Sequence, residues 1–106
     1  MTNSQKMALE QIKKLTNDLL YNDNHEIKQF KVTENNYFID VVVETGMKND
    51  EGTLAAFYCR DRAQLFVGKR GAITYPVYKN GKYMRKKFHG YSLLEAVCDQ
   101  REETGI

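Results

Sequence analysis

A strand–turn–strand pattern around Asn80-Gly81 holds the residues best suited to bind a ligand. Asparagine followed by glycine between two alternating runs is the strongest short signal for a type I′ β-hairpin. Pairing outward from this turn places Tyr78 opposite Tyr83, with Arg85 on the same face. Rings that stack on bases, beside cations that pair with phosphates, form the mixture that binds single-stranded nucleic acid. Tyrosine and arginine are equally typical of the strongest contacts in protein–protein interfaces.

The charged residues are distributed unevenly along the chain, although the net charge is only +2. Residues 60–89 carry nine lysines and arginines against one aspartate, a formal charge of +8, whereas residues 1–59 and 90–106 each carry −3. Such a basic region suits a polyanion or an acidic protein surface. The alternative is a solvated set of strand-edge lysines, which discourages aggregation between sheet edges. The candidate binding residues are Lys69, Arg70, Tyr78, Lys79, Lys82, Tyr83, Arg85 and Lys87.

These features predict a small non-enzymatic binding module whose basic, tyrosine-bearing hairpin contacts RNA or single-stranded DNA. The alternative is a protein-interaction module, such as a small inhibitor that docks onto an acidic or nucleic-acid-binding groove of a nucleic-acid-handling enzyme. A third interpretation gives the tyrosine pair no binding role, because cross-strand aromatic pairs by themselves stabilise hairpins by about 0.2–1 kcal/mol.

The run Gly68–Gly71 places Lys69 and Arg70 between two glycines. Backbone amides in a glycine-bounded turn can cradle a phosphate, and the two cations would hold it. The flanking runs are typical of strands, which argues against the helix-flanked phosphate clamp of KH domains, and the pattern of a P-loop is absent. The simpler interpretation is a tight β-turn with exposed cations.

The histidines and cysteines show no spacing typical of catalysis or metal binding, since HxH, HExxH and CxxC patterns are absent. We therefore expect no catalytic residue, no metal and no cofactor. Cys98 is expected on an apolar helix face, where a thiol behaves as a small hydrophobic group. The remaining enzymatic alternative is a metal-free ribonuclease, whose candidate groups alternate along one strand: Tyr83, Arg85, Lys87 and His89.

Length and composition predict one globular domain, residues 1–106. Apolar residues make up 42% and charged residues 28% of the chain, which argues against disorder. A single proline excludes proline-rich recognition segments. No run approaches the ~18 apolar residues of a membrane span, and the N-terminus lacks the apolar core of a secretory signal. We therefore expect a cytoplasmic protein that makes no membrane contact.

The elements that position the hairpin follow from hydrophobic periodicity. Apolar residues at helical spacing predict a helix over residues 4–21, with Thr2 and Gln5 as a capping box or Ser4 as a lone cap. Alternation predicts two strands over residues 26–34 and 37–45, in a register that places Val32 opposite Ile39.

The middle of the chain, residues 53–67, is ambiguous between one helix and two strands, residues 53–59 and 63–67, that meet around residues 60–62. Strands are favoured because Phe, Tyr, Val and Cys outnumber strong helix formers towards the ends of both runs. A capping box at Ser92 and Glu95 opens a short helix that ends near Arg101. The predicted fold class is α+β: an N-terminal helix, an antiparallel meander of about five or six strands, and a short C-terminal helix.

Alternation also divides the hairpin, residues 72–88, into two faces. Proline has no N–H to donate, so we expect the strand at Pro76 to be bulged or at a sheet edge. The binding face carries Thr74, Pro76, Tyr78, Tyr83, Arg85 and Lys87. The core face carries Ile73, Tyr75, Val77, Met84 and Phe88, with Lys86 as the one charged residue.

Overall fold

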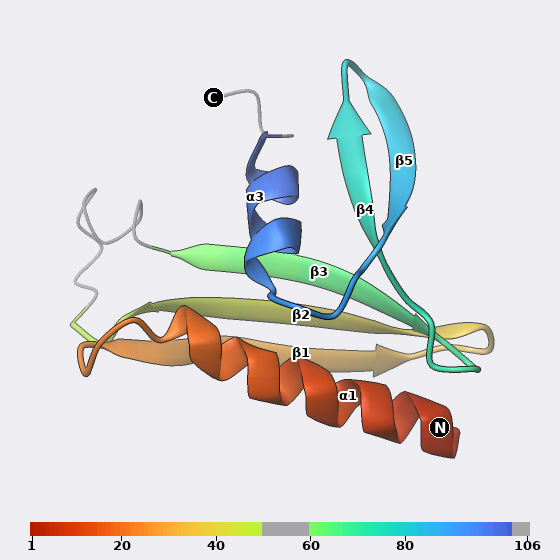
Figure 1. The fold of residues 1–106 in the computed structure, drawn as a ribbon, viewed down its shortest axis with the longest axis horizontal. Coiled ribbons are helices and arrows are strands. Elements are labelled where there is room, and N and C mark those ends of the chain that lie inside the picture. The colour runs from red at the N-terminus through yellow and green to blue at the C-terminus, as the bar shows by residue number, and fades with distance from the viewer. Residues whose placement is uncertain (50–59, 103–106) are drawn as a thin grey trace.

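The computed structural model describes residues 1–49 and 60–102 and confirms the α+β class. Within these residues, five antiparallel strands form one sheet in the order β1-β2-β3-β4-β5 (Figure 1). The segment 53–59, predicted as a strand, lies outside the described residues. The elements are α1 (Asn3–Thr16), the 3₁₀ turn η1 (Asn17–Leu19), β1 (His25–Glu34), β2 (Phe38–Met47), β3 (Asp61–Gly68), β4 (Ile73–Lys79), β5 (Lys82–Lys87) and α3 (Leu94–Glu102).

Helix α1 begins at the predicted capping box. The Thr2 hydroxyl accepts the backbone N–H of Gln5 at 3.1 Å, and the Gln5 side chain accepts the backbone N–H of Thr2 at 2.8 Å. The α-helix ends at Thr16, earlier than the predicted end at residue 21, and continues as η1. Asn17 and Asp18 are weak helix formers, which explains why the chain tightens there.

The strands β1 and β2 pair in a different register from the predicted one. Val32 lies opposite Val41 rather than Ile39. Asn35 causes the difference, because its side-chain oxygen accepts the backbone N–H groups of the second and third residues after it, at 2.8 and 2.9 Å. This local turn lengthens the loop beyond two residues. A shift of two residues leaves residues 29–34 on their expected faces of the sheet. A bulge at Lys28 then slips the register by one residue, so Ile27 lies opposite Thr45 and on the other face from the predicted one.

Strand β3 confirms the prediction for residues 63–67 and excludes the helical alternative there. The strand begins earlier than expected, at Asp61, so Arg62 belongs to the strand rather than to a turn. Its pairing with β2 runs from Thr45 opposite Asp61 to Phe38 opposite Gly68. The prediction failed at this end because the charged run 60–62 resembles a turn in the sequence. In the structure, buried Asp61 and exposed Arg62 continue the in–out alternation of the strand.

Strands β4 and β5 form the predicted hairpin, called the arm here (residues 73–87). The register is the predicted one, with Tyr78 opposite Tyr83 and Pro76 opposite Arg85. Asn80 and Gly81 both have positive φ angles, 54° and 75°, as a type I′ turn requires. Asparagine and glycine tolerate this backbone conformation better than other residues do.

The sheet splits between β3 and β4. These strands pair at only two positions, the last being Phe66 opposite Thr74, and Pro76 follows just beyond. Because proline has no N–H to donate, it cannot extend the ladder to Gln64, the β3 residue that this register would place opposite Pro76. The side chain of Gln100 on α3 takes the place of a strand there: it accepts the Gln64 N–H at 2.8 Å and donates to the Gln64 carbonyl at 2.7 Å. The arm therefore diverges from β3, and α3 lies alongside the gap (Figure 1).

Asp99 of α3 ties the helix to both strands of the arm. One carboxylate oxygen accepts the Tyr75 hydroxyl at 2.7 Å and the Lys86 ammonium at 2.8 Å. The hydrogen bonds from Lys86 and then from Tyr75 hold the pKa of Asp99 below its usual value. Burial, followed by the bond to Asp99, raises the pKa of Tyr75. Lys86, the one charged residue on the predicted core face of the hairpin, is thus paired with Asp99 at the rim of the core.

Two further expectations about the C-terminal half need correction. Met84 is 46% exposed rather than buried, because α3 packs on β3 and β4 and leaves the outer strand β5 uncovered. Helix α3 begins at Leu94, and Ser92 accepts its N–H at 3.1 Å. The Glu95 carboxylate accepts the backbone N–H of His89 at 3.1 Å, so it does not return to Ser92 to complete the predicted capping box.

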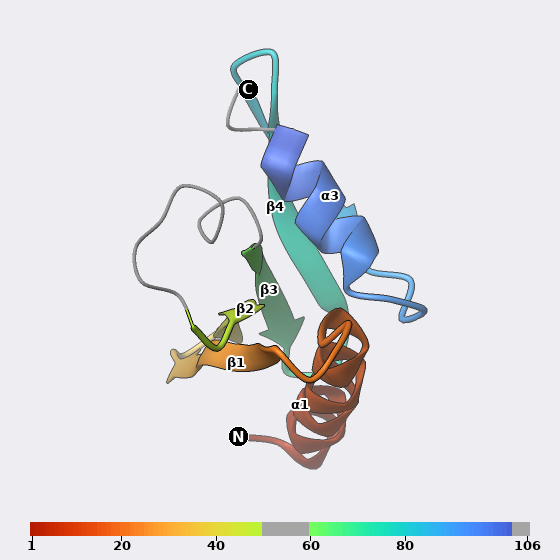
Figure 2. The ribbon, with the colours of Figure 1, turned by 90° about the vertical axis from the view of Figure 1, so that its left-hand side faces the viewer.

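Both helices lie on the same side of the sheet (Figure 2). The core forms between them and the odd-numbered residues of β2, β3 and β4. We call the other side of the sheet the open face. The core cluster consists of Ala8, Ile12, Leu19, Ile39, Val41, Val43, Ala63, Leu65, Val67, Ile73, Tyr75, Val77, Phe88, Leu93, Ala96 and Val97.

Candidate functional site

The tyrosine pair of the arm is exposed on the open face. The rings of Tyr78 and Tyr83 meet edge to face, with centroids 5.1 Å apart and an interplanar angle of 70°. They are 48% and 50% exposed, respectively. The type I′ turn sets this pairing, because it makes the two residues direct cross-strand neighbours. The arm therefore presents an aromatic surface that is available to a ligand.

Arg85 lies beside this pair and connects it to two phenylalanines. Its Nε donates to the Tyr83 hydroxyl at 3.2 Å. Its guanidinium carbon lies 4.6 Å from the ring centre of Phe66 and 5.3 Å from that of Phe38, within cation–π distance. The two phenylalanine rings meet edge to face at 5.0 Å. Arg85 is thus held in place against the sheet while its donors remain on the surface.

The arm carries five cations and no acidic residue: Lys79, Lys82, Arg85, Lys86 and Lys87. Lys86 pairs with Asp99, as described above. Within residues 1–49 and 60–101, no carboxylate lies within ion-pair distance of Lys79, Lys82 or Lys87. A phosphate need not displace a carboxylate from these three ammonium groups, so they are well suited to contact a nucleic-acid backbone.

The predicted binding residues divide into three places. Four of them share the open face of the arm, namely Tyr78, Tyr83, Arg85 and Lys87. Lys79 and Lys82 flank the turn at the tip, where by alternation their side chains start from the opposite face of the two-stranded ribbon. Lys69 and Arg70 lie at the other end of β4, separated from the tip by about 20 Å of strand at ~3.3 Å per residue.

The turn that carries Lys69 and Arg70 uses two of its amides internally. Gly68 N–H donates to the carbonyl of Ala72, and Gly71 N–H donates to that of Gly68, both at 2.9 Å. These two amides are therefore not available to cradle a phosphate. The side chains of Lys69 and Arg70 are exposed, as the simpler interpretation of the turn expects.

Phe38 and Phe66 are part of the site, although the sequence did not single them out. Their sequence signal was alternation: Phe66 stands between the core residues Leu65 and Val67, and Phe38 directly precedes the core residue Ile39, so each belongs to the opposite face. What the sequence lacked was the strand order, which brings β2, β3 and the arm side by side and places both rings next to Arg85.

The two histidines and Cys98 lie at separate places in the fold, in or next to β1, β5 and α3. His25 Nδ1 lies 3.0 Å from the side-chain oxygen of Asn22. His89 follows the end of β5, and its backbone N–H is bound by α3, so the alternating row of ribonuclease candidates ends at Lys87. Cys98 is exposed, contrary to the expected apolar environment, because it lies on the side of α3 away from the core.

A second cluster of polar groups joins the loop after η1 to β3 and α3. Asp61 is 6% exposed and accepts the Tyr21 hydroxyl at 2.8 Å, and it also pairs with Arg101. Burial, followed by the hydrogen bond to Asp61, raises the pKa of Tyr21 to about 12. Both oxygens of the carboxylate have partners, so this cluster serves to connect the elements.

Over the described residues, the side chains of His, Cys, Asp and Glu form no group of three that would hold a metal ion. None of the helices in this part of the chain is both long and apolar enough to cross a membrane. A scan of protein-family models and searches of curated proteins and of solved structures found no match to this chain.

Proposed function

We propose that this protein binds single-stranded nucleic acid, RNA or single-stranded DNA, on the open face of the arm. The observation that carries the proposal is the exposed pair of Tyr78 and Tyr83 beside Arg85, on a hairpin that has no acidic residue. Flat rings offer stacking surfaces that accept any base, and cations beside them attract the phosphates.

The site combines two forces of different range. Lys82 and Lys87, which have no ion-pair partner among the described residues, attract a polyanion over about a Debye length, ~10 Å at moderate salt. Stacking on Tyr78 or Tyr83 then holds individual bases, at roughly 1–3 kcal/mol for each base. Since the rings meet at a steep angle, each offers its own surface and neither covers the other completely.

The first test measures binding of a fluorescein-labelled oligothymidylate, and of the matching oligouridylate, by fluorescence anisotropy across a salt series. Each phosphate contact to a single strand contributes a slope of about −0.7 in a plot of log K against log salt. Contacts by Arg85, Lys87 and the two tip lysines predict a slope near −3 by the same relation. A slope near zero, or no binding at low salt, would contradict the proposal.

The second test separates stacking from charge. Tyr78→Ala and Tyr83→Ala should each weaken binding by about 5- to 150-fold, with the salt slope unchanged, because neither ring carries a charge. Tyr91→Ala is the matched control, since Tyr91 is 87% exposed in the segment that leads to α3. Equal effects of all three substitutions would argue against a role for the pair.

An acidic protein surface is the alternative ligand, and Arg85 distinguishes the two. Arginine held against aromatic rings is a typical anchor of protein interfaces. If the partner is a protein, Arg85→Ala weakens capture of that partner and leaves oligonucleotide binding unchanged. If the ligand is nucleic acid, the same substitution weakens oligonucleotide binding and reduces the salt slope by about 0.7.

A further inference from the structure

We propose that Tyr37, at the far end of the sheet, is an additional stacking residue for the same single strand. The bound strand then runs from the arm, past Arg85, to two neighbouring turns: the turn before β2, which carries Tyr37, and the turn after β3, which carries Lys69 and Arg70. This inference rests on the proposed function and extends it, because it assigns a further binding residue and a minimum length to the ligand.

The first step is the continuity of the surface between the arm and the body of the sheet. Arg85 contacts the Tyr83 hydroxyl through its Nε and covers the rings of Phe66 and Phe38 with its guanidinium. No gap therefore separates the tyrosine pair from Phe38 at the start of β2. A strand that stacks on the arm therefore meets the guanidinium of Arg85 along this direction, which lies over the half-buried ring of Phe38 and the buried ring of Phe66.

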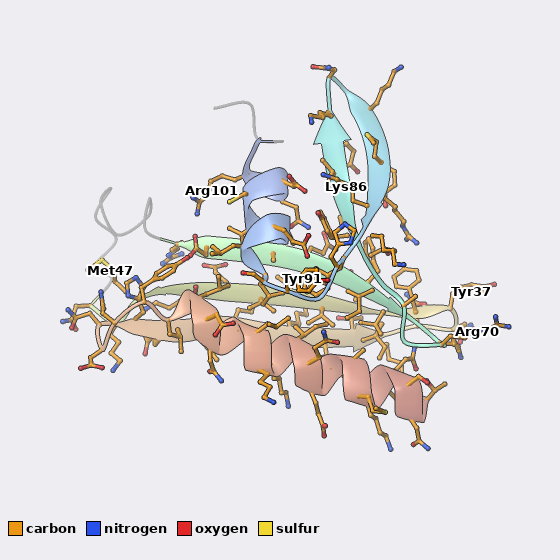
Figure 3. All side chains as sticks on the ribbon, in the orientation of Figure 1. Tyr37, Met47, Arg70, Lys86, Tyr91 and Arg101 are labelled. Atoms are coloured by element: carbon orange, nitrogen blue, oxygen red, sulfur yellow. The ribbon has the colours of Figure 1, made fainter. Side chains whose placement is uncertain are left out.

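The second step is the position of Tyr37, which directly precedes Phe38. The pairing of Phe38 with Gly68 brings the turn between β1 and β2 next to the turn that carries Lys69 and Arg70. Figure 3 shows Tyr37 and Arg70 projecting from the same end of the molecule. This end therefore repeats the composition of the arm, an exposed tyrosine beside exposed cations.

The third step is the state of the Tyr37 ring. It is 79% exposed, and within the described residues it makes no ring contact and its hydroxyl no hydrogen bond. Its backbone is held, because its N–H donates to the Asn35 side chain at 2.8 Å. A ring on a fixed backbone with a free face loses little freedom when a base stacks on it. Packing does not explain why an aromatic residue occupies this turn.

The local charge also favours a polyanion here. Two acidic residues lie three positions from Tyr37 in the chain, and both have partners. Glu34 is paired with the amino terminus of Met1 at 2.7 Å, and the Asp40 carboxylate accepts the side-chain amide of Gln64 at 3.0 and 3.2 Å. Lys69 and Arg70 have no such partner among the described residues, so this end of the sheet keeps a positive charge.

The length of the surface sets the length of the ligand. Strand β4 spans Ile73–Lys79, or about 20 Å at ~3.3 Å per residue. At the stacked spacing of ~3.4 Å per nucleotide, about six nucleotides cover this span. Single-strand sites of related chemistry occupy about 4–16 nucleotides. A ligand of about four nucleotides should fit the arm alone, whereas one of about eight should reach Tyr37.

The test compares fluorescein-labelled oligothymidylates of about four and about eight nucleotides on the full chain, with wild type, Tyr37→Ala, Tyr37→Phe and the Tyr91→Ala control. We expect Tyr37→Ala to weaken binding of the longer ligand by about 5-fold or more and to leave the shorter one unchanged. Tyr37→Phe should bind both as wild type does, because stacking needs the ring and not the hydroxyl.

Two outcomes would overturn the inference, and they are distinguishable. If the longer ligand binds and Tyr37→Ala has no effect on it, Tyr37 is not a binding residue, while the proposed function stands. If neither ligand binds at low salt, the proposed function fails and the inference fails with it. Circular dichroism of each variant establishes that the fold is unchanged.

Discussion

Replacing Gln100 with alanine tests how the split sheet is held together. The substitution removes the two hydrogen bonds that the side-chain amide makes with the backbone of Gln64, at 2.8 and 2.7 Å. A hydrogen bond contributes about 0.5–1.5 kcal/mol net, and a buried group left without a partner costs about 1–3 kcal/mol. Both residues are half-buried, so water reaches the freed groups in part. We expect a loss of about 2 kcal/mol in the free energy of unfolding.

The loss should be visible in thermal and urea unfolding followed by circular dichroism. For a domain of this size, about 2 kcal/mol lowers Tm by roughly 8–16 °C. Alanine is a better helix former than glutamine by a few tenths of a kcal/mol, so helix propensity works against the predicted loss and does not imitate it. The control is Lys14→Ala on the exposed side of α1, which should change the free energy of unfolding by less than about 0.5 kcal/mol.

A second substitution at the same position separates the two bonds. In Gln100→Glu the carboxylate still accepts the Gln64 N–H, but its other oxygen faces the Gln64 carbonyl. Only a protonated carboxyl can donate there, so the folded state raises the pKa of this group, and the variant should lose stability as the pH rises above its unfolded value of ~4.3. A Gln100→Ala variant as stable as wild type, within about 0.5 kcal/mol, would refute this account of the split.

Two further predictions concern the attachment of the arm to α3 and the turn at the base of the arm. Because the folded state lowers the pKa of Asp99, its charge stabilises the protein above the unfolded pKa, and this contribution is lost as the pH falls through the folded pKa. Asp99→Asn should therefore be less stable than wild type in neutral urea titrations, and the difference should shrink in acid. Gly71→Ala should destabilise more than Gly81→Ala: both have positive φ, but a Cβ at Gly71 would lie 3.1 Å from the Ser4 carbonyl oxygen, while Gly81 is open.

Each of these two predictions has a clear contrary result. A difference between wild type and Asp99→Asn that stays constant from neutral to acidic pH would show that the carboxylate charge does not stabilise the arm. Equal losses for Gly71→Ala and Gly81→Ala, in the range of about 1 kcal/mol expected for backbone strain alone, would show that the approach of α1 to the turn is not tight.

The arm was predictable from sequence because its determinants are local. Asn80-Gly81 fixes the turn, the turn fixes the register, and the register makes Tyr78 and Tyr83 neighbours. The faces of β2 and of residues 29–34 in β1 were predictable too, although the register and the bulge at Lys28 were not. The side chain of Asn35 lengthens that turn, and asparagine gives no sequence signal that distinguishes this turn from a shorter one.

The parts that the sequence did not predict depend on which elements become neighbours. Pro76 indicated a sheet edge, but the amide of Gln100 that replaces the missing strand comes from a helix far along the chain. The contact of Arg85 with Phe38 and Phe66 likewise needs three separate strands in one order. Alternation places each of these residues on a face, and only the strand order brings them together.

The burial along β4 has a consequence for how this protein can change. Val77 is the last residue of the strand in the core, and Tyr78 and everything beyond it up to Met84 is solvent-exposed. Substitutions, or even a longer loop, at the outer end of the hairpin would therefore leave the interior intact. Outside the Asn80-Gly81 turn, whose positive φ angles set the register, side chains at the tip can therefore be exchanged without disturbing the packed interior.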